Sequence, residues 1–425
     1  MPYYSKLGQI PSKRHIQFRR PDGALYSEEV FGTEGFSGPT STLYHIHPPT
    51  QVIGWKTLYS TQPEYVERDV MRMRHVKSMQ LPPKGDPVTG RTILFGNADV
   101  ELAVCAPTER MNYWFKNAQG DECIFIHFGS GTCQTSFGLL TFKPKDYIII
   151  PKGVIYQLKF DEPVRGSDEP APRFLVIETA NGSHIVPPPR YMSKKTAQFL
   201  EHAPYCERDL RTPELPMTIE EAGQHEVRIK ARNLVHSYMY NYHPCDVVGW
   251  DGCYYPYIFN IDDFSPIVGK HHMPPPTHQT FEAENFVICS FCPRLLDFHP
   301  QAVVVPYNHS NLDSDEVLYY VEGNYKARKG IEVGSLSMHP QGIPHGPHPG
   351  TVEASIGATV TNELAVMCDT FRPLYPTKAA LEIDDLKYPM SWEGESAPAR
   401  QLSGEQVAIH GKANGTAVKP ANTWD

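Results

Sequence analysis

Short runs of alternating hydrophobic and polar residues, separated by turn-forming residues, recur between about residues 122 and 176. The runs are ECIFIHF, GLLTFKP, DYIIIPKG, YQLKF and RFLVIET. Short alternating segments at regular spacing are typical of a β-sandwich or barrel. The pattern therefore predicts an all-β unit in the N-terminal half of the chain.

A second strand-rich block occupies the C-terminal half. Its runs are YYPYIFNI, NFVICSF, AVVVP, EVLYYVEGNYKARK, GSLSMHP, TVEASIGATV and ELAVMC. The proline-rich segment 187–245 between the blocks is expected to be loop-like, with one short helix over 218–226, where a threonine can cap and acidic residues follow. We expect an N-terminal β domain over 1–240, a C-terminal β domain over 241–395 and a polar tail over 396–425.

Composition narrows the class of protein. The chain has 425 residues, enough for two domains, and its 40 prolines and 31 glycines argue against a helical bundle. A net charge of -9 without a basic stripe argues against a nucleic-acid partner. No apolar run reaches membrane-spanning length, so no membrane partner is expected. The first residues lack the apolar core of a signal peptide, so a cytoplasmic location is expected.

The most specific motif is G-x5-P-x-G-x2-H over residues 334–345, which resembles the second metal motif of a cupin barrel. Upstream, Glu316 and Gly323 bracket six residues, as in the first cupin motif, and His309 lies seven residues before Glu316. His309, Glu316 and His345 are therefore predicted metal ligands. Two imidazoles and one carboxylate leave coordination positions open, a pattern that favours non-haem Fe(II) and oxygen chemistry.

Asn311 stands where the first cupin motif commonly has its second histidine. This difference changes the expected ligand set from three histidines and a glutamate to two histidines and a glutamate. Asp313 and Asp315 are competing carboxylates close to His309, but only Glu316 has the spacing to the following glycine.

The N-terminal block carries an incomplete copy of the same motifs. Glu122 occupies the place of the glutamate, and Pro151 and Gly153 keep the turn of the second motif. Tyr156 replaces the closing histidine, and no histidine lies just upstream of Glu122. We therefore expect a mostly β, two-cupin (bicupin) chain of jelly-roll barrels with few short helices, in which the N-terminal cupin is metal-free.

Further histidines are candidates for catalysis. His339 precedes the turn of the second motif, and His272 and His278 lie in GKHHMPPPTHQTF. The triple proline fixes an extended loop, which could hold a histidine over the metal. A histidine suits general-base catalysis on a phenol, although exposed loop histidines without a catalytic role remain an alternative. Tyr325, at the turn after the glutamate strand, is either a packing residue or a substrate contact.

The chain resembles the homogentisate 1,2-dioxygenase family over most of residues 100–375. The runs that carry the resemblance are VVGWDGCYYPYIFNI, HHMPPP, FVICSF, YNHSN, EVLYYVEGNYKARKG and GSLSMHPQGIPHGP. The resemblance implies that His272 is the substrate-side histidine, that His339 lies beside the metal site, and that Tyr325, together with His345, contacts the substrate. The interval from His309 to Glu316 is one residue longer than in animal members, and the N-terminal G-F-G-N-E-F signature is absent, which indicates a divergent, bacterial-type branch.

The resemblance implies an Fe(II)-dependent extradiol-type ring-cleaving dioxygenase. Homogentisate and O2 would give maleylacetoacetate in tyrosine and phenylalanine catabolism, and the enzyme would form a homo-oligomer. A related cupin dioxygenase acting on gentisate or a substituted hydroquinone is the nearest alternative. An isomerase-type or non-catalytic bicupin is the alternative of another class.

Overall fold

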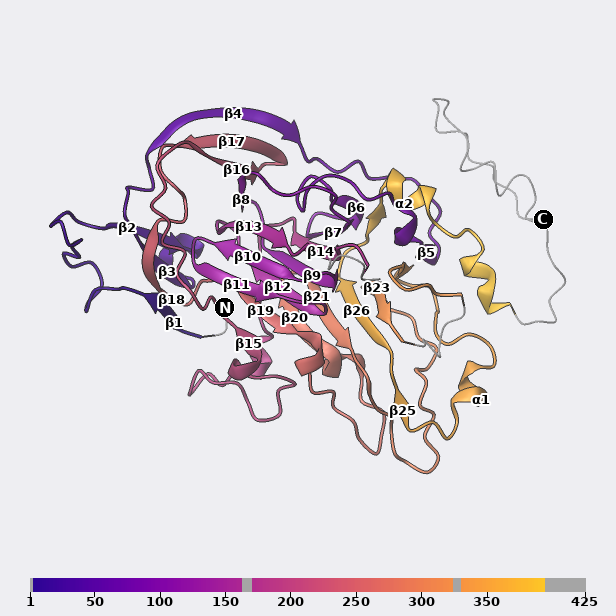
Figure 1. The fold of residues 1–425 in the computed structure, drawn as a ribbon. Coiled ribbons are helices and arrows are strands. Elements are labelled where there is room, and N and C mark those ends of the chain that lie inside the picture. Colours follow the sequence, from indigo (N-terminus) through magenta and orange to yellow (C-terminus); the bar gives the residue numbers. More distant parts are fainter. Residues whose placement is uncertain (1–2, 163–169, 324–329, 394–425) are drawn as a thin grey trace.

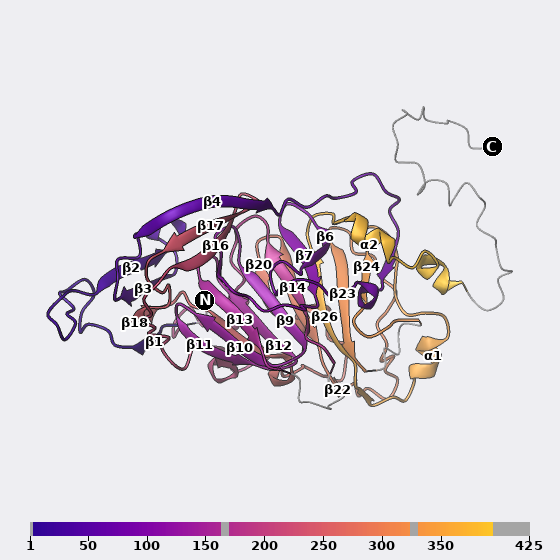
Figure 2. The same ribbon diagram turned by 45° about the horizontal axis from the view of Figure 1, so that its top comes forward.

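The computed structural model describes residues 3–162, 170–323 and 330–393, which are mostly β. Figures 1 and 2 show β1 (Ser5–Gly8) to β3 (Thr40–His45) at one end of the molecule and β23 (Asp315–Glu322) and β26 (Leu364–Thr370), which come late in the chain, toward the other. The prediction of a mostly β chain with few short helices is confirmed, although its sheets are open layers rather than closed barrels. The predicted tail over 396–425 lies outside the described residues.

The N-terminal unit is built on two large sheets whose side chains share one hydrophobic core, to which Phe115 and Ile124 belong. In spatial order, the seven-stranded sheet contains β11 (Gly138–Phe142), β10 (Gly131–Thr135), β13 (Ile155–Phe160), β8 (Trp114–Asn117), β16 (His225–Ala231), β17 (Leu234–Tyr240) and β4 (Val52–Ser60). The eight-stranded sheet contains β15 (Leu210–Arg211), β19 (Tyr257–Asn260), β12 (Asp146–Ile150), β9 (Glu122–Phe128), β14 (Arg173–Thr179), β7 (Val100–Cys105), β6 (Thr92–Gly96) and β27 (Tyr375–Pro376).

A smaller sheet lies at the N-terminal end of the molecule (Figure 1). Its order is β1 (Ser5–Gly8), β18 (Val247–Gly252), β3 (Thr40–His45) and β2 (Ser27–Gly32). The strand β18 comes from much later in the chain than its neighbours, so this sheet joins distant segments of the sequence.

The C-terminal unit is a six-stranded sheet that carries the predicted ligand strand β23. Its order is β20 (Gln279–Ala283), β21 (Phe286–Phe291), β26 (Leu364–Thr370), β23 (Asp315–Glu322), β24 (Leu336–His339) and β5 (Arg74–Val76). A further pair consists of β22 (Arg294–Leu295) and β25 (Val360–Thr361).

The two units exchange edge strands. The early strand β5 pairs antiparallel with β24 of the C-terminal unit, and the late strand β27 pairs with β6 of the N-terminal unit. Arg74 of β5 is buried and donates to Asp384 near the C-terminal end of the described chain, at 2.7 Å. The exchange therefore ties each unit to a segment from the other end of the sequence.

Helices are few and short. The α-helices are α1 (Thr351–Ser355) and α2 (Lys378–Glu382), and the 3-10 helices are η1 (Glu34–Phe36), η2 (Ser78–Gln80), η3 (Pro189–Tyr191), η4 (Glu207–Asp209), η5 (Ile261–Asp263), η6 (Pro275–His278) and η7 (Tyr388–Trp392). In the described ranges no helix combines the length and hydrophobicity that crossing a bilayer requires.

The structure corrects the expectation for residues 187–245. The segment 218–226 forms no helix, and Gly223 there adopts a φ of 137°, which a helix cannot accommodate. The strands β16 and β17 form a hairpin whose two turn residues, Arg232 and Asn233, have φ values of 54° and 57°. Two consecutive residues with positive φ are typical of the tight turn that matches strand twist.

The second strand-rich block also needs two corrections. Residues 302–306 (AVVVP) lie outside the strands, and residues 351–355, expected as part of a strand, form α1. Proline at position 306 removes a backbone donor that a strand ladder would need. The other runs of this block that fall in the described residues contain strands.

Candidate metal and substrate site

The three predicted ligands meet at one end of the six-stranded sheet. Glu316 lies on β23, whereas His309 and His345 lie on loops that form an isolated antiparallel bridge. The backbone amides of these two histidines donate to each other's carbonyl oxygens, both at 2.8 Å. The candidate ligand atoms of the trio all lie within 4.8 Å of one another. The backbone bridge thus fixes the two imidazoles on one side of the carboxylate.

Each of the two imidazoles is oriented by a backbone carbonyl. The Nδ1 atom of His309 lies 3.1 Å from the oxygen of Tyr307, and that of His345 lies 3.0 Å from the oxygen of Ile343. Since a carbonyl oxygen only accepts, Nδ1 carries the proton in both rings and Nε2 keeps its lone pair. Each Nε2 lies 3.8 Å from Oε2 of Glu316.

The lone pairs fit a metal ion. Nε2 of His345 is buried and has no hydrogen-bond partner among the described residues. A buried polar atom without a partner is costly unless something else occupies its lone pair. Two imidazole nitrogens and a carboxylate oxygen in this arrangement are the donor set of the facial triad that holds non-haem Fe(II).

His339 contacts two members of the trio, Glu316 and His345. Its Nδ1 lies 2.9 Å from Oε1 of Glu316, its Nε2 lies 3.2 Å from the hydroxyl of Tyr388, and its ring stacks on His345 at 4.6 Å between centroids. Burial would raise the pKa of Glu316, but the nearby imidazoles of His309, His339 and His345 outweigh this effect and hold that pKa well below its usual range. The structure therefore places His339 as a buried neighbour of the ligands, on the strand before the motif turn.

A cavity of about 430 Å³ opens onto two members of the trio. His309 and Glu316 form part of its wall, and Asn311, in the place of the missing histidine, lines it as well. Its other walls are largely apolar. The apolar lining residues are Ile267, Val268, Met273, Phe291, Leu295, Leu296, Val304, Leu318, Ala365 and Met367. An apolar cavity with a few convergent polar groups is the usual form of a small-molecule site.

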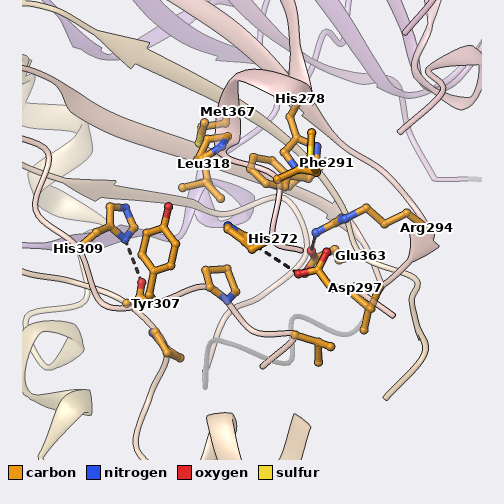
Figure 3. Close-up of a pocket in the computed structure, with 18 of the residues that line it drawn as sticks. His272, His278, Phe291, Arg294, Asp297, Tyr307, His309, Leu318, Glu363 and Met367 are labelled. Carbon is orange, nitrogen blue, oxygen red and sulfur yellow. Dashed lines mark hydrogen bonds and ion pairs between the residues drawn. The ribbon is translucent and has the colours of Figure 1, made fainter. Parts of the chain in front are cut away.

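His272 and His278 both line this cavity but in different environments. Figure 3 shows His272 facing Asp297, with Nδ1 and Oδ2 3.5 Å apart, and its ring packs edge-on against Tyr307. His278 is buried and stacks on Phe291 at 4.4 Å between centroids. Burial, reinforced by the charge of Arg294, lowers the pKa of His278 to about 3. Tyr325, the predicted substrate contact, lies outside the described residues.

The sequence alone did not identify several polar residues of the cavity. Arg294 donates to Glu363 at 3.0 Å, and both line the cavity with Asp297 at the side away from His309 (Figure 3). Asp369 faces Glu316 across the ladder between β26 and β23, and its Oδ1 is buried without a hydrogen-bond partner in the described chain. Burial, with the charge of Glu316, raises the pKa of Asp369 well above its usual range. None of these residues belongs to a motif with fixed spacing. The sequence signal that could have indicated the acidic ones is their position next to predicted strands.

The incomplete motifs of the N-terminal unit meet at an arginine. The guanidinium of Arg91 donates to Glu122 at 2.7 and 3.3 Å and to the hydroxyl of Tyr156 at 2.9 Å. Asn117 donates to the same carboxylate at 3.1 Å. Arg91 thus supplies to Glu122 the positive charge that a metal ion would supply in a complete cupin site.

Two family models match adjoining parts of the chain. The model described as Homogentisate 1,2-dioxygenase N-terminal matches residues 24–261, and that described as Homogentisate 1,2-dioxygenase C-terminal matches residues 262–397. The trio, its supporting histidine and the cavity with His272 and His278 all fall within the C-terminal match.

Curated relatives extend over nearly the same length. A protein of Saccharolobus solfataricus named "Putative dioxygenase SSO1533" is 36% identical over 398 residues, which cover 92% of this chain and 99% of that protein. The homogentisate 1,2-dioxygenase of Sinorhizobium medicae is 26% identical and covers 87% of this chain and 86% of its own. That of Dictyostelium discoideum is 28% identical and covers 83% of each chain. With both family models matched in order along its length, the chain belongs to the homogentisate 1,2-dioxygenase family and is a dioxygenase.

Proposed function

We propose that this dioxygenase uses Fe(II), held by His309, Glu316 and His345, to cleave the ring of homogentisate with O2, giving maleylacetoacetate. The observation that carries the proposal is the trio itself, whose imidazole lone pairs face one carboxylate at the wall of a largely apolar cavity. Three protein ligands leave positions for a ring hydroxyl and for O2. Iron, when bound, would supply O2 activation and a template for the substrate.

His272 is the residue that we assign as general base. It lines the cavity, and Asp297 faces its Nδ1, which leaves Nε2 free to accept a proton from a ring hydroxyl. The carboxylate of Asp297 would stabilise the imidazolium that forms. His278 is a weaker candidate, because a histidine whose pKa is about 3 holds a proton poorly at neutral pH. We assign to His278 a packing and hydrogen-bonding role.

His339 is proposed to hold the carboxylate of Glu316 rather than to touch the substrate. It donates from Nδ1 to Glu316 and contacts Tyr388 through Nε2, so both of its nitrogens are engaged. Tyr325 remains our proposal for a substrate contact, and His345 is proposed to meet the substrate only through the shared metal.

The apolar cavity supports a small aromatic substrate and also bears on the alternatives. Gentisate and substituted hydroquinones would fit the same chemistry, so they are the nearest alternatives. A zinc isomerase is less well supported, because Asn311 lines the cavity where such sites commonly keep a further ligand. A non-catalytic bicupin is less well supported because such proteins lose metal ligands, whereas His309, Glu316 and His345 lie together here. The degenerate N-terminal cupin, in which Arg91 engages Glu122 and Tyr156, is proposed to bind no metal.

A homo-oligomer, a place in tyrosine and phenylalanine catabolism and a cytoplasmic location remain part of the proposal. Leu295 lines the cavity and is 64% exposed, and Phe298 and Leu312, which adjoin lining residues in the chain, are 67% and 81% exposed. Large exposed apolar side chains around a cavity support its coverage by a second copy of the chain.

The proposal is tested by loading the protein with Fe(II) without oxygen and then measuring O2 consumption with homogentisate, gentisate and hydroquinone. We expect homogentisate to consume one O2 per molecule and to give an open-chain product identified by mass. Preferred turnover of gentisate or hydroquinone would change the substrate but keep the chemistry. Tight zinc binding, with no O2 uptake on any of the three compounds after iron loading, would refute the dioxygenase proposal.

A further inference from the structure

The N-terminal cupin contains a cavity of its own, of about 280 Å³, between its two large sheets. Its polar wall contains Glu101 of β7, Glu178 of β14, Lys230 of β16 and Arg91. The cavity therefore adjoins the place where Glu122 and Tyr156 represent the incomplete metal motifs. The dioxygenase site makes no use of it.

The buried charged groups at this wall and next to it carry an excess of negative charge. Arg91 is engaged by Glu122, and Lys230 is shared between Glu178, at 2.6 Å, and Glu101, at 3.5 Å. When Glu122, which does not line the cavity itself, is counted with Arg91, three carboxylates face two cations. Glu101, Glu178 and Lys230 are each only 5% exposed. An uncompensated buried carboxylate is unfavourable unless it is protonated or meets a further positive charge. Burial, opposed by Lys230 and reinforced by Glu178, raises the pKa of Glu101.

Two hydroxyl groups at the same cavity also lack partners. The Tyr59 hydroxyl and Oγ1 of Thr61 are buried, and neither has a hydrogen-bond partner within the described ranges. Buried polar groups are nearly always hydrogen-bonded, so such exceptions next to a cavity indicate room for a polar ligand. Much of the remaining lining is apolar. The apolar residues are Val88, Ile93, Ala103, Phe115, Val176 and Val235.

We propose that this cavity is a second ligand site that binds a small protonated amine with an apolar group of about one ring. The ammonium would lie against Glu101 and Glu178, where it supplies the missing positive charge, and the apolar group would pack on Phe115 and Val176. The volume of the cavity is just below roughly 300 Å³, the lower end of the usual range for small-molecule sites, so the ligand can be no larger than about one ring with its amine. The inference is independent of the dioxygenase chemistry.

Three probes of equal size and different charge test the inference. Benzylamine, benzyl alcohol and benzoate are titrated calorimetrically into the full-length, iron-loaded protein. We expect benzylamine to bind in a one-to-one complex and at least about tenfold more tightly than the other two, as a charge-assisted hydrogen bond requires. Equal or tighter binding of benzyl alcohol or benzoate, or no binding of benzylamine, would overturn the inference.

Variants then locate the bound amine. Glu101→Gln keeps the shape of the side chain but removes the excess charge, and we expect it to weaken benzylamine binding at least about tenfold. Thr61→Trp, at the partly exposed edge of the cavity, should block entry without touching the buried charges. Glu363→Gln, in the other cavity, is the matched control and should leave the affinity unchanged. Loss of binding in Glu363→Gln alone would assign the amine to the dioxygenase cavity and refute the second site.

Discussion

Nδ1 of His339 lies 2.9 Å from Oε1 of Glu316, whereas Nε2 of His309 and Nε2 of His345 each lie 3.8 Å from the other oxygen, Oε2. The two oxygens of Glu316 therefore have different partners: Oε1 accepts from the supporting histidine, and Oε2 faces the two candidate ligands. The hydrogen bond to Oε1 fixes the orientation of the side chain, and Oε2 is the oxygen that we propose as the metal ligand.

Replacing Glu316 tests the ligand set. Glu316→Gln keeps the size of the side chain but removes the charge, and we expect iron affinity to fall by more than about 100-fold, the upper end of the loss caused by an outer hydrogen-bond partner. Iron content after desalting measures the loss, and an unchanged melting temperature shows that the fold is intact. Glu322→Gln, exposed on the same strand, is the control. Full iron content in Glu316→Gln would refute the assignment.

The contact between His339 and Tyr388 predicts a smaller effect. Tyr388→Phe removes the hydroxyl that lies 3.2 Å from Nε2 of His339, so we expect iron affinity to fall about tenfold, as for other partners of ligand-supporting residues. Competition with a chelator measures the affinity. Tyr375→Phe removes a more exposed hydroxyl and should behave as the wild type. Equal affinities in both variants would show that the contact does not tune the site.

His272 and its neighbour in sequence form a matched pair. His272→Ala should keep iron but lower kcat about 10²–10⁴-fold, the contribution of a general base. His271→Ala, which changes a residue that does not line the cavity, should leave kcat unchanged. The kcat of Asp297→Asn should lie between those of His272→Ala and His271→Ala, because a neutral amide stabilises the imidazolium less than a carboxylate does. Wild-type kinetics in His272→Ala would show that His272 is not the general base, so that either His278 has this role or no histidine does.

The arginine of the degenerate cupin is predicted to be important for stability. Arg91→Met leaves Glu122 buried without its cation, so we expect the free energy of unfolding to fall by about 3–5 kcal/mol. The double variant Arg91→Met/Glu122→Gln should regain part of this loss, because the uncompensated charge is gone. Urea denaturation measures both. Additive losses in the double variant would contradict the proposed pairing.

A buried histidine between the units predicts a pH effect on stability. His127 lies 2.7 Å from the hydroxyl of Tyr319 and 3.0 Å from the oxygen of Val321, and burial lowers its pKa to about 4. The unfolded chain protonates this residue below about pH 6.5, whereas the folded chain does not until about pH 4, so stability is lost as pH falls between these values.

His127→Gln isolates this contribution, because glutamine does not titrate. Between pH 7.5 and pH 5, the wild type should lose about 2 kcal/mol more unfolding free energy than the variant. Urea denaturation at the two pH values measures the difference. Equal losses would show that His127 is protonated in the folded state at pH 5.

The ligand trio was predictable because its spacing is fixed by local geometry. A glycine ends the strand that begins near Glu316, and the P-x-G turn follows the paired strand β24. Glu316 and the loop that carries His345 therefore lie at the same end of these two strands, and the turn residues are visible in the sequence. Asn311 and Tyr156 could likewise be read as substitutions in known positions, since the surrounding motif residues remain.

The residues that sequence did not identify depend on contacts between distant segments. Arg91 reaches Glu122 from outside the motif, and Asp297 faces His272 from a separate loop, so neither has a fixed spacing to its partner. The hairpin at 225–240 was missed because proline-rich flanks suggested a loop, although the alternating HEVRIKA run carried a strand signal. The two side-chain contacts join residues far apart in the sequence, so a search for local motifs does not find them.

Because β5 and β27 each pair with a strand of the other unit, neither unit has all of its strands when it is separated from the other. A fragment that begins after the N-terminal unit would expose the backbone donors and acceptors of β24 along an open edge, and the N-terminal fragment would do the same at β6. Such edges invite aggregation. We therefore expect the half of the chain that we propose binds no metal to keep the other half folded and free of aggregation.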